Sequence, residues 1–207
     1  MLELFISAFV TLFVVIDPPG CAPIFAGLTS TAPPITARRM AARACVIATA
    51  ILLVFALFGE KLLGALHIEL NSFRIAGGIM LFLIAIDMVF EKRTERREKR
   101  SEEVRTAAEV DDVSVFPLAI PMIAGPGSIA TIMLLMSRAQ GTEATLMILA
   151  ALVAVMFLCL AALMAAGPIM RLVGAKAEAV VTRLLGVLLA ALAAQYVIDG
   201  LRAVIAS

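Results

Sequence analysis

Long apolar runs alternate with short polar stretches along the chain, and six of these runs have roughly the 20 residues that a helix needs to cross a bilayer. A segment that is dense in both signs of charge and lacks apolar periodicity, Glu91 to Asp112, separates the third run from the fourth. The pattern predicts six membrane-spanning helices and a solvated connector. The predicted spans are Leu2–Leu28, Met40–Phe58, Asn71–Phe90, Val115–Met136, Thr145–Ala166 and Val180–Leu201.

The composition agrees with this pattern. Of 207 residues, 62% are hydrophobic and only 16% are charged, which is too apolar for a soluble domain of this length. We therefore expect an all-α polytopic membrane protein in contact with lipid. The three cysteines, Cys21, Cys45 and Cys159, lie apart in apolar runs without metal-binding or redox spacing, so we interpret them as packing residues. No pattern indicates a cofactor, a structural metal or a nucleic-acid partner.

Lysine and arginine are distributed unequally between the two sets of loops. If both termini lie outside, most of the cations, including Arg38, Arg39 and those of the connector, fall on the inner side. The cations left outside are Lys61, Arg74, Arg138 and Arg202. Because cytoplasmic loops carry the excess of Lys and Arg, we expect both termini outside and the connector inside.

The two halves of the chain resemble each other. "PPGCAPIF" in the first predicted span is echoed by "GPGSIATI" in the fourth, and "FRIAGGIMLFLIAI" in the third by "TRLLGVLLAALAAQ" in the sixth. The matched pairs are Pro19 with Pro126, Gly20 with Gly127, Arg74 with Arg183 and Gly77 with Gly186. We predict two three-span repeats, residues 1–90 and 114–207, joined by the connector 91–113. Since each repeat has an odd number of spans, the repeats are inverted.

The first predicted span is interrupted by "DPPG". Asp17 is an ionisable residue in an apolar run, and Pro18 and Pro19 remove two amide donors directly after it. Gly20 permits backbone conformations that are closed to other residues. We expect a broken helix whose unpaired groups face protein or a wet cavity. The groups expected to be free are the carbonyls of Ile16 and Asp17 and the amides of Cys21 and Ala22.

The fourth predicted span contains a second break, "AGPGS". Gly125 and Gly127 offer backbone freedom, and Pro126 suits the first turn of a new half-helix. The amides of Gly127, Ser128 and Ile129 would then face the cavity at the positive end of the helix dipole, where a carboxylate binds well. The Ser128 hydroxyl would add another donor.

The two breaks complement each other chemically. Asp17 would bind an ammonium group, and the amides around Gly127 would bind a carboxylate, so a small zwitterionic amino acid would fit both. Asp17 has two further interpretations: it would carry a coupling cation, H+ or Na+, or it would only cap a broken helix. Each Pro/Gly cluster also has the simpler interpretation of a kink. Thr11, Thr49 and Thr131 are expected to bond to their own helices or to line the site.

The segments "VTLFVVIDPPGCAPIF", "FRIAGGIMLFLIAI" and "IPMIAGPGSIATI", in this order over six spans, resemble the MarC family of bacterial and archaeal inner-membrane proteins. That family includes transporters of small neutral amino acids. The resemblance implies a transporter of glycine, alanine and similar amino acids in a cytoplasmic membrane, driven by a cation gradient or working as an exporter.

From these observations we expect a secondary transporter, not an enzyme, that alternates access around a midplane site. The predicted substrate-binding residues are Asp17, Gly20, Gly125, Gly127 and Ser128, and the predicted helix-breaking residues are Pro18, Pro19 and Pro126. Three rivals stay open: export of another small solute or a drug, a membrane scaffold without transport, and an intramembrane enzyme with Asp17 and Asp87 as an acid pair. A homo-oligomer is also left open.

Overall fold

A computed structural model describes residues 2–90 and 112–205 and gives only the backbone path for 168–179. Apart from Asp112 and Val113, the predicted connector lies outside the described residues. All the regular elements in the described ranges are helices, as predicted. In chain order they are α1 (Leu2–Ile16), α2 (Pro18–Leu28), α3 (Pro34–Ala65), α4 (Leu70–Val89), the π-helix η1 (Ser114–Ile123), α6 (Pro126–Ser137), α7 (Gly141–Met164) and α8 (Ala166–Ile205).

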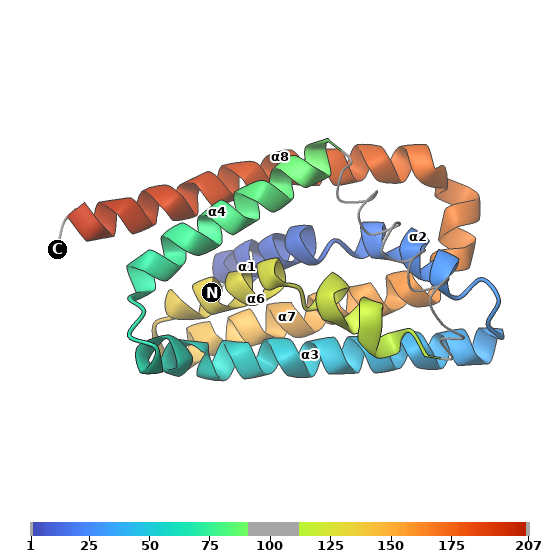
Figure 1. The fold of residues 1–207 in the computed structure, drawn as a ribbon, viewed down its shortest axis with the longest axis horizontal. Helices are drawn as coiled ribbons and strands as arrows, with labels where there is room; N and C mark the ends of the chain where they lie inside the picture. Colours follow the sequence, from blue (N-terminus) through green and yellow to red (C-terminus); the bar gives the residue numbers. More distant parts are fainter. Residues whose placement is uncertain (1, 91–111, 206–207) are drawn as a thin grey trace.

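The helices form an elongated bundle with both ends of the chain at the same end of it (Figure 1). By length and composition, five segments of the described chain can cross a membrane, with α1 and α2 together counted as one, and the pair η1–α6 makes a sixth. That pair is bent by 52°. The six predicted spans and the breaks in the first and fourth are therefore present.

The helices α3 and α8 extend further than the sequence pattern predicted. The helix α8 has 40 residues and already begins at Ala166, so the polar loop predicted before Val180 is helical. The pattern of apolar runs did not indicate this, because a helix continues beyond the hydrocarbon wherever its residues are good helix formers, as alanine, lysine and glutamate are. Pro168 lies in the first turn of α8, where proline is well tolerated.

The helices α4 and α8 run in opposite directions and pack through glycine (Figure 1). A Cβ on Gly78 of α4 would lie 2.7 Å from Val197 Cγ2, and a Cβ on Gly186 of α8 would lie 3.1 Å from Val89 Cγ2. Each glycine thus approaches the same relative position of the other helix, as in a contact across a two-fold axis. In the structure the residue equivalent to Gly186 is Gly78. The sequence comparison had matched Gly186 with Gly77, one residue earlier. These contacts support the inverted repeat, which stays a prediction.

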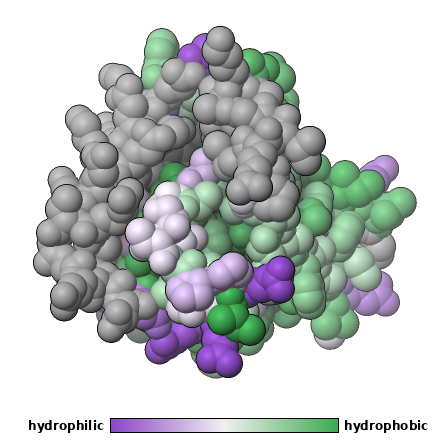
Figure 2. Space-filling model, turned by 90° about the vertical axis from the view of Figure 1, so that its right-hand side faces the viewer, coloured by the Kyte–Doolittle hydropathy of each residue, from purple (hydrophilic) through white to green (hydrophobic). Residues whose placement is uncertain are grey.

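The buried side chains form two clusters, and both include residues of α1 and α6. The larger joins α1, α2, α3, η1 and α7, and the smaller joins the last turn of α1 to α4 and α8. Large apolar side chains also cover the outer faces of α4 and α8, as expected for surfaces that meet lipid. They include Phe82, Leu83, Leu184, Val187 and Leu188. In the end-on view of Figure 2, hydrophilic side chains gather at the lower edge, on the side of α3.

Candidate functional site

Asp17 forms the first break by adopting the left-handed helical conformation, with φ 58° and ψ 63°. Aspartate tolerates this conformation better than most residues because its short polar side chain bonds locally. Here Asp17 Oδ1 accepts a hydrogen bond from the Gly20 amide at 3.1 Å and caps α2. The side chain is 1% exposed. Asp17 therefore caps a broken helix, which was one of its interpretations from the sequence.

Gly20 is needed at this break for space rather than for conformation. The residue with positive φ is Asp17, so the backbone freedom predicted for Gly20 is not used. A Cβ on Gly20 would instead lie 2.8 Å from Asp17 Cγ and strike the carboxylate. Gly20 therefore permits the close approach by which Asp17 caps the helix.

The backbone groups left free at the first break differ from those predicted. The Asp17 amide donates to the Phe13 carbonyl at 2.9 Å, and the Asp17 carbonyl accepts from the Cys21 amide at 3.0 Å. The Asp17 carbonyl and the Cys21 amide were both expected to be free, and this prediction was wrong because the helix resumes after a single residue and pairs them with each other. Pro18 and Pro19 have no N–H, so the carbonyls of Val14 and Val15, four residues earlier, receive no helical hydrogen bond from them.

The second break leaves the start of α6 without a side-chain cap. Gly125 occupies the N-cap position with φ −84°, and Pro126 begins the helix as predicted. The backbone bonds described here start with the Ile129 amide, which donates to the Gly125 carbonyl at 3.0 Å. Ile129 therefore cannot serve a ligand as predicted, whereas the amides of Gly127 and Ser128 are first-turn donors for which the described residues show no backbone carbonyl partner.

Gly125 and Gly127 serve close approach, as Gly20 does, and not the predicted backbone freedom. A Cβ on Gly125 would strike the Pro121 carbonyl oxygen. A Cβ on Gly127 would strike Ile84 of α4 and would lie 3.6 Å from Val15 Cγ1 of α1. Gly127 thus sets the start of α6 directly against the end of α1.

Ser128 and Cys21, at matched positions of the two halves, make matched contacts. The Ser128 hydroxyl donates to the Ile123 carbonyl at 2.7 Å, and the Cys21 thiol to the Ile16 carbonyl at 3.5 Å. Each side chain closes its break by bonding the carbonyl five residues earlier. The Ser128 proton is therefore already used, and only its amide stays available for the predicted role in binding a carboxylate.

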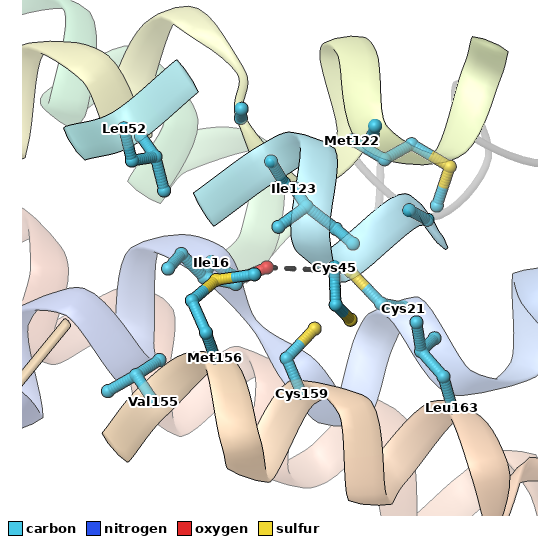
Figure 3. Packing of buried hydrophobic residues seen from close by; sticks show 14 of the residues in the cluster. Ile16, Cys21, Cys45, Leu52, Met122, Ile123, Val155, Met156, Cys159 and Leu163 are labelled. Atoms are coloured by element: carbon cyan, nitrogen blue, oxygen red, sulfur yellow. Dashed lines mark hydrogen bonds between the residues drawn. The ribbon is translucent and has the colours of Figure 1, made fainter. Parts of the chain in front are cut away.

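The three cysteines meet beside the first break, which their distant positions in the sequence did not indicate. Cys21 of α2, Cys45 of α3 and Cys159 of α7 are buried and point toward one another (Figure 3). The described residues form no group of three or more ligand side chains suited to a metal ion. The thiols lie in the larger buried apolar cluster, at the junction of α2, α3 and α7.

A polar cluster joins the end of α6 to α8. Arg138 Nη2 lies 2.6 Å from Asp199 Oδ2, and Gln195 Nε2 donates to Asp199 Oδ1 at 2.7 Å. The Arg138 guanidinium also lies over the Tyr196 ring, 4.6 Å from its centroid. We name Arg138, Gln195, Tyr196 and Asp199 the α6–α8 tie.

Comparison with known proteins agrees with this architecture. The family described as "MarC family integral membrane protein" matches residues 2–205. The chain belongs to the MarC family. Among curated MarC relatives, UPF0056 membrane protein MJ1677 of Methanocaldococcus jannaschii is 35% identical over 97% of this chain and 97% of its own length. UPF0056 membrane protein YvbG of Bacillus subtilis is 32% identical over 98% of this chain and 96% of its own length. No solved structure matches.

Proposed function

We propose that this MarC protein is a secondary transporter of small neutral amino acids, such as glycine and alanine, in a bacterial or archaeal cytoplasmic membrane. The observation that carries the proposal is the contact between Gly127 and Val15, which brings the two helix breaks together. Asp17 follows Val15 by two residues. A negative charge and an uncapped helix start therefore lie on adjacent segments.

The two breaks offer unlike partners to a ligand. The end of α1 has a negative helix dipole, the Val14 carbonyl without its helical donor, and the Asp17 carboxylate, all of which favour a cation. The start of α6 has a positive dipole and the amides of Gly127 and Ser128, which favour an anion. A zwitterion satisfies both ends at once, whereas a simple cation or anion satisfies only one.

The surroundings of Gly127 favour a short ligand. The same Cβ position that would strike Ile84 lies 3.6 Å from Val15 Cγ1 and 3.8 Å from Leu81 Cδ2. These apolar side chains from α1 and α4 enclose the start of α6, so a bulky amino-acid side chain would have to displace them. Glycine and alanine have the smallest side chains and require the least displacement.

The site lies between segments from different halves of the chain, which suits alternating access. Equivalent helices run in opposite directions in Figure 1, as α3 and α7 do. A relative movement of the halves would open the junction of α1 and α6 to one side and then to the other. We propose coupling to H+ or Na+, with Asp17 as the residue that carries the cation.

Counterflow of labelled glycine into proteoliposomes tests this function without assuming the coupling ion. Vesicles loaded with unlabelled glycine should accumulate the label transiently and saturably, and external alanine should compete. Vesicles that contain the Asp17→Asn variant should behave like protein-free vesicles. Absence of counterflow by the wild-type protein with every small neutral amino acid would contradict the proposal. Separate pH and Na+ gradients then identify the coupling ion.

A further inference from the structure

The Thr131 hydroxyl differs from three other threonine hydroxyls of the described helices and their ends. Thr29, Thr49 and Thr145 each donate to the carbonyl four residues earlier, at 2.8, 2.7 and 3.2 Å. This is the usual way in which a helix satisfies a threonine side chain. Thr131 is 0% exposed, and its Oγ1 has no hydrogen-bond partner in the described part of the chain.

A buried hydroxyl without a partner is destabilising, because it loses its bonds to water and gains none in return. Valine has nearly the same shape and would fill the position without that cost. Unpaired polar atoms of this kind therefore need an explanation, and a partner that binds and leaves is one. Thr131 lies on α6, one turn after its uncapped start.

The helix geometry directs Thr131 toward the junction of α1 and α6. Thr131 follows Gly127 by four residues, so both lie on the same face of α6. Ala130 faces α4, since its Cβ lies 3.8 Å from the position of a Cβ on Gly77. Thr131 lies on the other side of Gly127 from Ala130, about 100° around the axis of α6. Val15 of α1 is one of the side chains beside Gly127. Side chains of a helix lean toward its N terminus, which brings the Thr131 hydroxyl back over the first turn of α6.

We infer that Thr131 is a substrate-binding residue whose hydroxyl donates to the carboxylate of the transported amino acid. Together with the amides of Gly127 and Ser128 it forms a set of three neutral donors for one anionic group. The carboxylate end is favoured over the ammonium end because the amides of Gly127 and Ser128 lie at the positive end of the α6 dipole. This inference rests on the proposed function and adds a side chain to the site that the sequence predicted.

Binding of glycine to the purified full chain, measured by calorimetry, tests the inference with two variants. Thr131→Val removes the hydroxyl at nearly constant volume, and we expect the Kd for glycine to rise about tenfold or more, as for loss of a hydrogen bond to a charged group. Thr131→Ser keeps the hydroxyl and should bind within about threefold of the wild type. Thr131→Ala provides a second deletion if the valine variant does not fold.

Two single-charge probes assign the hydroxyl to one end of the substrate. Acetate carries only the carboxylate and methylamine only the ammonium, and both are measured as competitors of labelled glycine. In Thr131→Val the inhibition constant of acetate should rise by the same factor as the Kd for glycine, while that of methylamine stays unchanged. The inverse pattern would overturn the assignment.

The outcomes separate this inference from the proposed function. If the wild-type protein binds glycine and Thr131→Val binds it equally well, the role of Thr131 is overturned and the transport proposal stands. If Thr131→Val melts at a higher temperature and binds glycine as the wild type does, the Thr131 hydroxyl has no role in binding. If the wild-type protein binds no small amino acid, both proposals are overturned together.

Discussion

Gly127 of α6 lies against Val15 of α1, at the point where both helices are interrupted. The two interruptions are built differently, because Asp17 caps the start of α2 while no side chain caps the start of α6. One break therefore satisfies its own amides and holds a negative charge, and the other leaves two amides for a ligand. This difference within a repeated motif is the basis of the proposed zwitterion site.

Substituting Gly127 with alanine should weaken binding and stability together. The added methyl group would strike Ile84, so we expect a loss of about 1–3 kcal/mol in the free energy of unfolding and at least about a tenfold rise in the Kd for glycine. Gly27→Ala is the matched control, because nothing lies within 4 Å of its Cβ. That variant should bind normally. Normal binding by Gly127→Ala would show that the start of α6 is not part of the site.

Two variants of Asp17 separate its structural role from its charge. Asparagine also caps helices and tolerates the left-handed conformation, so Asp17→Asn should unfold much like the wild type. Alanine neither caps helices nor tolerates the left-handed conformation, so the free energy of unfolding of Asp17→Ala should be lower by about 1–3 kcal/mol. Unfolding in mixed micelles measures both. Equal losses in the two variants would mean that the charge, rather than the cap, stabilises the fold.

The α6–α8 tie should contribute modestly to stability and should weaken with salt. The side chains of Arg138 and Asp199 are 38% and 30% exposed, so solvent screens their attraction. We expect this ion pair to contribute about 0.2–1 kcal/mol to the free energy of unfolding. Asp199→Asn should lower the melting temperature slightly in dilute buffer, and the difference should shrink in about 1 M salt. The exposed Glu60 offers a control substitution, Glu60→Gln. A salt-independent loss would assign the effect to packing on Tyr196.

Asp112, at the end of the connector, should make the stability of the protein depend on pH. The Ser114 hydroxyl and amide, followed by the charge of Arg43, lower the pKa of Asp112 below its usual value of 3.8, although burial opposes them. The carboxylate therefore contributes stability that is present in full above about pH 4 and is lost as the pH falls through the lowered pKa.

Melting curves of the wild type and Asp112→Asn check this contribution. The advantage of the wild type should be constant from pH 7 to about pH 5 and should disappear in more acidic solution. An advantage that grows on acidification would reverse the sign of the effect and contradict the assigned pKa shift.

The sequence predicted the membrane spans and both breaks, because proline, glycine and an isolated acid leave strong local signals. It did not predict which backbone groups the breaks leave free. That depends on a single residue, Asp17, adopting a conformation that lets the helix resume at once. Partners that act across helices were also missed, among them Val15 with Gly127 and Arg138 with Asp199, since only packing brings them together. The Ser128 hydroxyl was assigned to a ligand because its bond to Ile123 forms only in the folded break.

The most direct test of the proposed site is the binding of glycine to the purified protein and to its Asp17→Asn variant, measured by calorimetry under the same conditions. The account predicts saturable binding by the wild type and a rise of at least about tenfold in the Kd of a variant that is still folded. Equal binding by both proteins would contradict it, because Asp17 would then be only the cap of α2.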